Sequence, residues 1–297
     1  MSQTVQQPLP SPLITSTSSS TASVAQVLDR LSAARLVPYG AAFTPNSPEA
    51  RLGCYLWAQA LSASLHPFVG LIEVVLRNAI HQSLSLQVTA RASVSAAWYD
   101  RAVPGAIALK GKSLERIEQR LCEGTPPTRR LIQPSPDAVV SGMSFGFWPN
   151  LLEGLSNRHA PRTFTDVFPH HPHSKPPYWS REANKLAALT QVKRLQQLRN
   201  RVCHFEPIWK PHAISPGHGS PRHWSHAVAA LRKFHAEMLD VLVWISPETA
   251  AAYRASFGWD WFNKLCTTHA VNGFLSDHTT SARLLSMAAA QPVTGSP

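Results

Sequence analysis

Residues 68–86 read FVGLIEVVLRNAIHQSLSL, and this stretch decides the fold class. Its apolar residues recur three and four positions apart, which is the spacing of one wide helical face. Residues 48–65 carry the same period just before it, and His66-Pro67 marks the boundary between the two runs. We therefore predict two consecutive helices at the centre of an all-α protein.

Helical periods recur on both sides of this pair. They predict helices at about 24–36, 180–204 and 223–245, and one or two more within 93–123. Proline clusters separate them, so residues 169–177 (PHHPHSKPP) and 207–221 are predicted to be long Pro/His-rich loops. We expect a single helical domain over 26–278, between a disordered Ser/Thr-rich tail at 1–25 and a flexible C-terminal tail at 279–297.

The chain is strongly basic. Its 297 residues include 28 Lys and Arg against 17 Asp and Glu, a formal charge of +11. This balance suggests an acidic polymer as partner, although a solvated positive face explains it as well. The N-terminus lacks the pattern of a signal peptide, and the longest apolar stretch, 68–76, is far shorter than the roughly 20 residues that span a bilayer. We expect a cytoplasmic protein with no membrane partner.

Cysteine and histidine spacing gives no reason to expect a metal or another cofactor. The four cysteines form no C-x-x-C pair, and Cys203 is interpreted as a small packing residue in preference to a nucleophile. His170, His171 and His173 lack regular ligand spacing and a carboxylate partner, so we predict no metal site there.

The hexapeptide Arg199-Asn200-Arg201-Val202-Cys203-His204 combines two groups that metal-free phosphodiester cleavage needs. An arginine fork can hold a phosphate, and an imidazole can carry a proton near neutral pH. A structural interpretation stands beside this one. Cations favour the C-terminal end of a helix, and a histidine there can cap free carbonyls.

A second polar group lies on the predicted helix 68–86. Glu73, Arg77 and His81 are spaced four apart and form one stripe, with Asn78 beside it. The stripe is either an exposed face with one Glu–Arg pair, or it faces the hexapeptide. In the second case Glu73 orients an arginine or histidine there, and Arg77 adds a phosphate contact.

Arg199 and His204 are five residues apart, a separation of about 140° around an ideal helix. They do not share one face of a straight helix. Two arrangements relieve this difficulty: the helix ends near His204, as Pro207 suggests, or two chains complete the site across a two-fold axis.

Three motifs together resemble the Abi-like (abortive infection) family of the HEPN superfamily. The first is E-x-x-L-R-N at Glu73, Leu76, Arg77 and Asn78, and the second is S-F-G-F-W at 144–148. The third is R-N-x-x-x-H at 199–204, followed by Glu206-Pro207-Ile208. They occur in the family's order and cover roughly 27–245. The Ser/Thr-rich tail and the Pro/His-rich insertions depart from the family pattern.

The resemblance implies an HEPN-like helical bundle that forms a homodimer and cleaves RNA without metal. It also implies phage defence of the abortive-infection or toxin–antitoxin type, with a protein or RNA antitoxin as a further partner. The expected reaction is attack of a ribose 2′-hydroxyl on the adjacent phosphate. The alternative is a basic RNA-binding module of the same fold that cuts nothing.

Each candidate residue has an expected role in this reaction. His204 is the general acid or base, Arg199 stabilises charge on the phosphorane oxygens, and Asn200 holds a phosphate oxygen or orients the imidazole. Two further sets complete the prediction: supporting residues Glu73, Arg77 and Asn78, and RNA contacts Arg201, Lys193 and Arg194.

Overall fold

The computed structural model describes residues 24–210 and 223–276. Helices dominate this part of the chain, and the strands form one short hairpin, so the predicted all-α class is confirmed. The N-terminal half contains α1 Val24–Leu31, α2 Ala33–Phe43, α3 Pro48–Ser64, α4 His66–Val88, α5 Gly111–Leu121, β1 Cys122–Glu123, β2 Thr128–Arg129 and α6 Pro136–Ser141. The C-terminal half contains α7 Phe147–Gly154, α8 Ala160–Val167, α9 Pro176–Trp179, α10 Glu182–Cys203, α11 Trp224–Ile245, α12 Pro247–Arg254, α13 Phe257–Leu265 and α14 Thr268–Ser276.

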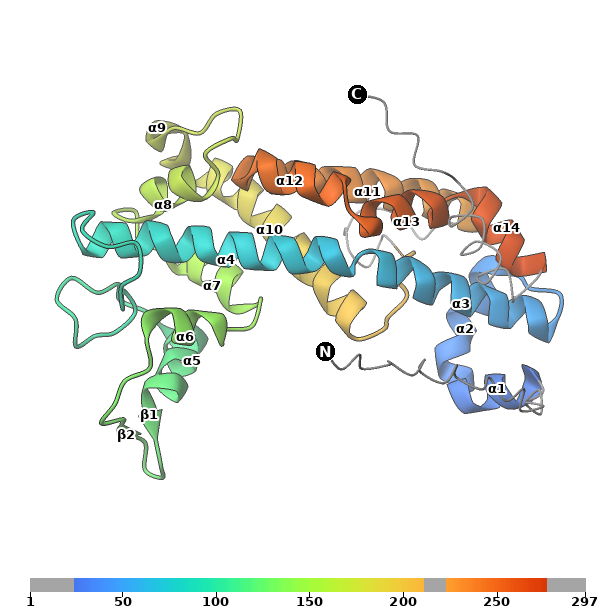
Figure 1. The fold of residues 1–297 in the computed structure, drawn as a ribbon, viewed down its shortest axis with the longest axis horizontal. Coiled ribbons are helices and arrows are strands. Elements are labelled where there is room, and N and C mark those ends of the chain that lie inside the picture. The colour runs from blue at the N-terminus through green and yellow to red at the C-terminus, as the bar shows by residue number, and fades with distance from the viewer. Residues whose placement is uncertain (1–23, 211–222, 277–297) are drawn as a thin grey trace, which may run out of the picture.

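Helices α3 and α4 form the central rod of the molecule (Figure 1). They meet at Leu65, and Pro67 occupies the first turn of α4, so the predicted boundary at His66-Pro67 is confirmed. One face of α4 is fully buried through residues that follow the predicted helical spacing: Phe68, Ile72, Leu76, Ile80 and Leu84. Helices α1, α2, α8 and α10–α14 pack against this rod, which makes it the core of the fold.

Three helices begin with a proline that directly follows a serine. Ser47, Ser135 and Ser246 each precede a proline and each accept a hydrogen bond from a backbone N–H three residues later. The serine satisfies an otherwise free donor of the first turn, and the fixed φ of proline suits the first helical position. These Ser-Pro pairs therefore start α3, α6 and α12.

One predicted helix was wrong in its extent. The single helix expected at 24–36 is two helices, because Ser32 has a φ of 67° and turns the chain, while Pro38 lies inside α2. Within 93–123 the structure has one helix, α5, in agreement with the one or two that we predicted. The segment that follows α5 contains the β1–β2 hairpin, which extends from the body with α5 (Figure 1).

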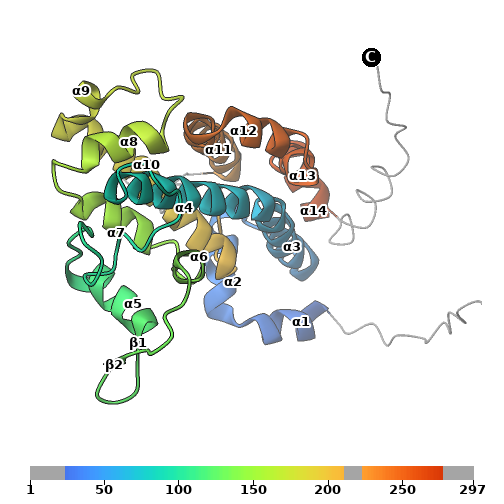
Figure 2. The same ribbon diagram turned by 60° about the vertical axis from the view of Figure 1, so that its left-hand side comes forward.

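The C-terminal helices return along the central rod. Figures 1 and 2 show α11–α14 lying against α3 and α4, and α10 crossing α4. The indole of Trp57 on α3 donates to the Leu265 carbonyl at 2.9 Å. Helix α14 comes so close that a Cβ added to Gly53 would lie 1.8 Å from the Phe274 oxygen. The region after residue 245 is thus part of the same core.

Among the described residues, the rod 48–88 is the one stretch long and apolar enough to cross a membrane by length and composition. A buried core helix gives the same signal, and less than half of the relevant window is buried here. The predicted tails at 1–25 and 279–297 lie outside the described residues, except that Val24 and Ala25 begin α1. Residues 211–222 of the second predicted loop also lie outside them.

Candidate functional site

Arg199 on α10 meets Glu73 on α4. Its Nε donates to the Glu73 Oε2 at 3.1 Å, and both side chains are partly exposed. Within residues 24–210 and 223–276, neither Nη nitrogen of Arg199 makes a hydrogen bond. The carboxylate therefore holds the guanidinium by one edge and leaves its outer fork free for an anion.

The last turn of α10 closes in a Schellman motif centred on His204. The amide of Glu206 donates to the Arg201 carbonyl at 2.9 Å, and the amide of Phe205 donates to the Val202 carbonyl at 3.4 Å. Phe205 takes the left-handed conformation that ends such a helix, with a φ of 56°. His204 is the C-cap residue, so α10 does end at the hexapeptide.

The His204 side chain is exposed and makes no hydrogen bond or ion pair in the described part of the chain. The chain is helical up to Cys203, and His204 keeps a φ of −98°. Its Cβ direction is consequently close to that of a helical residue. Ending the helix here does not bring His204 round to the face of Arg199.

Asn200 lies one turn before His204 on the same face of α10. Its carbonyl accepts the His204 amide at 2.9 Å, and its side chain has no hydrogen bond among the described residues. Asn200 is half-buried, whereas His204 is exposed. The exposed Cys203 is the neighbour of His204, not the buried packing residue that we expected.

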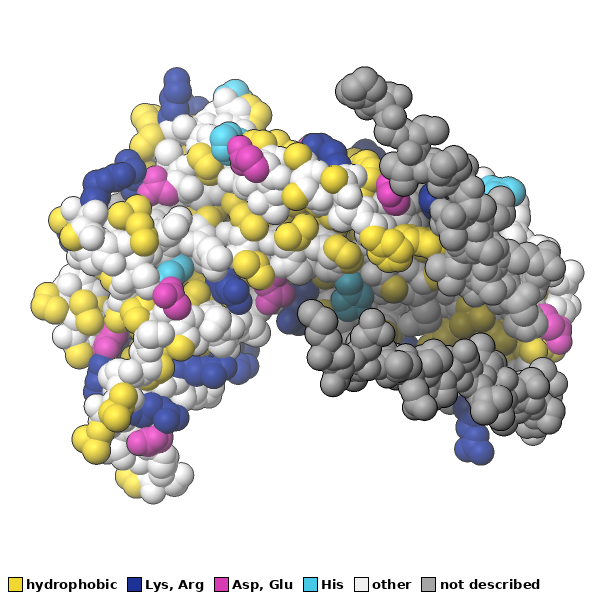
Figure 3. Space-filling model, in the orientation of Figure 1, with side chains coloured by type: hydrophobic (Ala, Val, Ile, Leu, Met, Phe, Trp, Pro, Cys, Tyr) yellow, Lys and Arg dark blue, Asp and Glu magenta, His cyan; other side chains and the backbone are white. Residues whose placement is uncertain are grey.

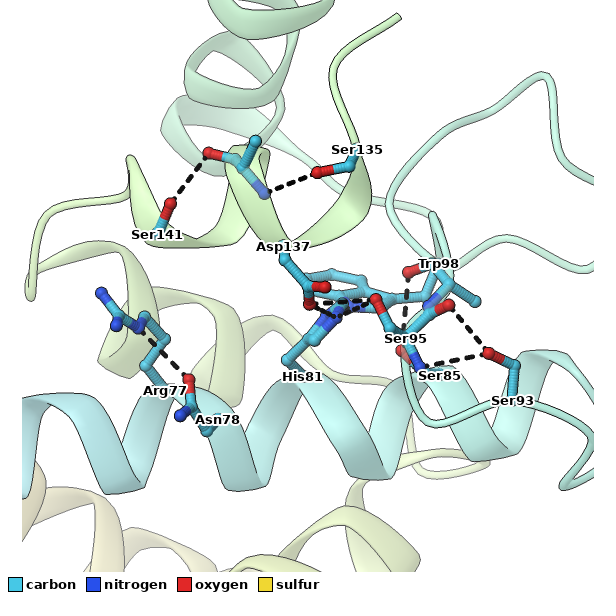
Figure 4. A network of polar contacts seen from close by, with 12 residues as sticks. Arg77, Asn78, His81, Ser85, Ser93, Ser95, Trp98, Ser135, Asp137 and Ser141 are labelled. Atoms are coloured by element: carbon cyan, nitrogen blue, oxygen red, sulfur yellow. Dashed lines mark hydrogen bonds and ion pairs between the residues drawn. The ribbon is translucent and has the colours of Figure 1, made fainter.

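The remaining polar residues of α4 turn to other partners. Arg77 Nε donates to the Asn78 Oδ1 at 3.4 Å, and neither side chain has a hydrogen bond to the hexapeptide in the described residues. Figure 4 shows His81 pointing from α4 toward Asp137 on α6. Of the predicted stripe, Glu73 alone makes a hydrogen bond or ion pair to the hexapeptide in the described part of the chain.

His81 is the centre of a separate polar cluster (Figure 4). The buried indole of Trp98 donates to its Nδ1 at 2.8 Å, and its Nε2 lies 3.2 Å from Ser95 Oγ and 3.3 Å from Asp137 Oδ1. Because an indole N–H can only donate, Nδ1 carries no proton and the ring is neutral with its proton on Nε2. Burial lowers the pKa of His81 despite the nearby Asp137, which agrees with this tautomer.

The predicted RNA contacts on α10 are paired with protein groups. Arg194 donates to Glu237 on α11 at 2.7 Å and lies 4.9 Å from the Phe234 ring centre, while Lys193 bonds Glu153 at 2.8 Å. Arg201 donates to the Pro207 carbonyl at 2.8 Å. RNA would have to compete with these partners, so the contacts give each residue a structural role as well.

The S-F-G-F-W element leads into α7, which packs against α10. Phe145, Phe147 and Trp148 are buried in the core at the start of α7. Gly146 lies beside the Gln196 side chain of α10, whose flexible end can move if a Cβ is added. This motif positions the helix that carries the hexapeptide.

Two other features bear on ligands. His171 packs against Trp179 and Trp244, and within 24–210 and 223–276 no group of three or more His, Cys, Asp or Glu side chains is placed to hold a metal. On the face in Figure 3, Lys and Arg side chains are scattered over the end that carries α5–α9, with Asp and Glu among them. The part of that face that the grey atoms leave visible shows no continuous basic groove.

Comparison with protein-family models, curated proteins and solved structures finds no significant match in any of the three.

Sequence reasoning missed two residues at the end of α10. Arg35 on α2 donates through Nη1 to the Phe205 carbonyl at 2.9 Å, across 170 positions of sequence. No local pattern signals such a contact. Phe205 itself directly follows His204, and an exposed aromatic beside a candidate catalytic residue was a signal that could have been noticed.

Proposed function

We propose that this protein is a metal-independent endoribonuclease whose site is built from Arg199 and His204. The observation that carries the proposal is the contact between Glu73 and Arg199. It joins two of the three sequence motifs that suggested a nuclease, and it leaves the outer edge of the guanidinium free. An arginine held in this way can bind a phosphate without first reorganising its own side chain.

In the proposed reaction a ribose 2′-hydroxyl attacks the adjacent phosphate. His204 takes the hydroxyl proton as the new P–O bond forms, and Arg199 stabilises the charge on the phosphorane oxygens. The bond to the 5′-oxygen then breaks, water protonates the leaving oxygen, and His204 returns its proton to the solvent. The products are a 2′,3′-cyclic phosphate and a 5′-hydroxyl.

A homodimer is part of this proposal. Arg199 and His204 lie about 140° apart on α10, so one chain does not present both to a single phosphate. A two-fold axis near the end of α10 brings Arg199 of one protomer to His204 of the other. Asn200 lies one turn before His204 on the same face of α10 and is suited to orient the imidazole or a phosphate oxygen.

The resemblance to Abi-like proteins motivates the biological part of the proposal. We infer an abortive-infection or toxin–antitoxin role in phage defence in the cytoplasm, with a protein or RNA antitoxin as the restraining partner. The HEPN-like bundle belongs to the same proposal, since an all-α fold is compatible with it.

The test is cleavage of RNA by purified protein in EDTA, with analysis of the product ends. We expect cyclic phosphate ends from wild type, and a loss on the order of 10²-fold or more for His204→Ala. His226→Ala is a matched control on α11. Circular dichroism should show that both variants are folded. Full cleavage by His204→Ala would show that His204 is not part of the active site.

A non-catalytic RNA-binding module is the second candidate function. The angular separation of Arg199 and His204 within one chain favours it if the protein is a monomer. In that case RNA binding should be salt-sensitive and no cleavage should appear in wild type.

A further inference from the structure

Phe205, the residue directly after His204, has a conformation and exposure that packing does not explain. Its side chain is 58% exposed and is neither in the apolar core nor packed against it within the described residues. Its φ of 56° lies in the left-handed region, where a residue with a Cβ is strained and glycine is the usual choice. A glycine here would remove strain and lose no core contact.

Two arginine side chains hold the backbone of the turn that contains Phe205. Arg35 donates to its carbonyl at 2.9 Å, and Arg201 donates to the Pro207 carbonyl at 2.8 Å. The chain then enters the core at Trp209, whose ring centre lies 5.6 Å from Tyr39 and 5.0 Å from Phe43. The aromatic ring is thus presented outward on a fixed turn.

Positive charge surrounds this turn. Arg35 and Arg201 bond its backbone, and Lys210 follows it. Burial and then the nearby Arg201 lower the pKa of Lys210, which indicates cations close enough to repel each other. Glu206 offsets one of them, 3.6 Å from Arg201. A polyanion would relieve the repulsion that remains.

We propose that Phe205 is a stacking platform for one unpaired base of a single-stranded RNA whose adjacent phosphate reaches the Arg199–His204 site. Aromatic rings bind bases through their π faces, and a cationic surround holds the backbone, which is how proteins bind single strands with little sequence preference. Duplex RNA keeps its bases stacked internally and is excluded from the platform. This inference rests on the proposed ribonuclease function and names its substrate class.

The test measures binding in the His204→Ala background, so that cleavage does not interfere. The probe is a short single-stranded RNA with 2-aminopurine, whose fluorescence is quenched when the base stacks. Phe205→Leu keeps apolar bulk and Phe205→Gly suits the backbone. We expect both to bind roughly 5- to 100-fold more weakly with quenching lost, and Phe205→Tyr to retain both. Phe257→Leu, at an exposed phenylalanine on α13, is the matched control.

Stability measurements separate binding from folding. Phe205→Gly should unfold at an equal or higher urea concentration than the parent, because it relieves the left-handed strain. Wild-type affinity and quenching in Phe205→Leu would overturn the platform. The platform would also be contradicted if Phe205→Gly became monomeric and kept its affinity for RNA. That result would show that the Phe205 ring contacts a second copy of this chain and not RNA.

The two proposals fail in different ways. If wild type binds the single strand through Phe205 but leaves no cyclic phosphate ends, the nuclease proposal fails and the platform stands. If wild type cleaves and the Phe205 variants bind and cleave as well as it does, the platform alone fails.

Discussion

At the scale of single residues, the Glu73 carboxylate decides where the Arg199 guanidinium lies. The 3.1 Å contact uses Nε and fixes the direction of the outer fork. Losing such a partner leaves the arginine charged but mobile, and misplacement by about 1 Å can cost on the order of 10²-fold in rate. Glu73 is thus a positioning residue in the proposed site.

We expect Glu73→Ala to lower RNA cleavage roughly 10- to 100-fold with the fold intact. Glu73→Gln keeps an acceptor for Nε and should lose less. Glu153→Gln is the matched control, because Glu153 also pairs with a cation on α10, at 2.8 Å from Lys193. Single-turnover kinetics with circular dichroism measure both effects, and equal rates for Glu73→Ala and Glu153→Gln would contradict a positioning role.

At the scale of helices, α14 packs on α3 through a glycine. A Cβ at position 53 would meet the Phe274 carbonyl at 1.8 Å and the next backbone atoms just beyond it. Backbone cannot yield as a flexible side chain does, so the two helices would have to separate. The close approach of the C-terminal helix to the central rod depends on this one position.

We expect Gly53→Ala to destabilise the protein by about 1 to 3 kcal/mol or more. Gly70→Ala is the opposite case, because a Cβ there meets nothing within 4 Å and alanine favours the helix. That change should stabilise by up to about 1 kcal/mol. Urea unfolding compares the two, and a neutral Gly53→Ala would show that α14 is not packed as described.

At the scale of the whole molecule, two buried neutral histidines tie distant segments together. His81 links α4 to Trp98 and α6, and His235 on α11 lies 2.8 Å from the Tyr253 hydroxyl on α12. Burial lowers the pKa of His235 to about 3 and also lowers that of His81. Both rings stay neutral in the folded protein at pH values where the unfolded chain takes up protons.

These shifts predict acid-sensitive stability. Each histidine contributes its full share to the free energy of unfolding at pH values above 6.5, the ordinary pKa of histidine. That contribution is lost as the pH falls from 6.5 toward the lower pKa of the folded state. The free energy of unfolding should therefore fall by up to about 1.4 kcal/mol per pH unit for each ring. His81→Gln should flatten this slope in urea titrations between pH 7 and 4.5, while His269→Gln, at an exposed site, should not.

The proposed two-chain site makes a further prediction for the assembled molecule. Arg199→Ala and His204→Ala should each be inactive alone. Mixed and re-equilibrated, they form heterodimers with one intact Arg199–His204 pair, so cleavage should recover to at most about a quarter of wild type. Sedimentation should show a dimer at working concentrations. No recovery on mixing, with subunit exchange verified, would contradict a shared site.

The sequence by itself determined the helical class, the central rod and the end of α10. These depend on local properties: the 3.6-residue period, the proline at position 67 and the short-range bonds of a helix terminus. It also suggested that Glu73 reaches the hexapeptide, because a polar stripe on an otherwise buried helix needs a partner. The Ser-Pro pairs that begin α3, α6 and α12 are an equally local signal of a helix start.

Only the tertiary structure decided which partner each polar side chain takes. His81 lies on the same stripe as Glu73 but bonds Trp98 and Asp137, and Arg35 reaches Phe205 across 170 residues. Such choices depend on how helices cross, which is set by packing over the whole core and not by spacing along one helix. The left-handed Phe205 is the clearest case, because its local preference opposes the conformation that the surrounding contacts impose.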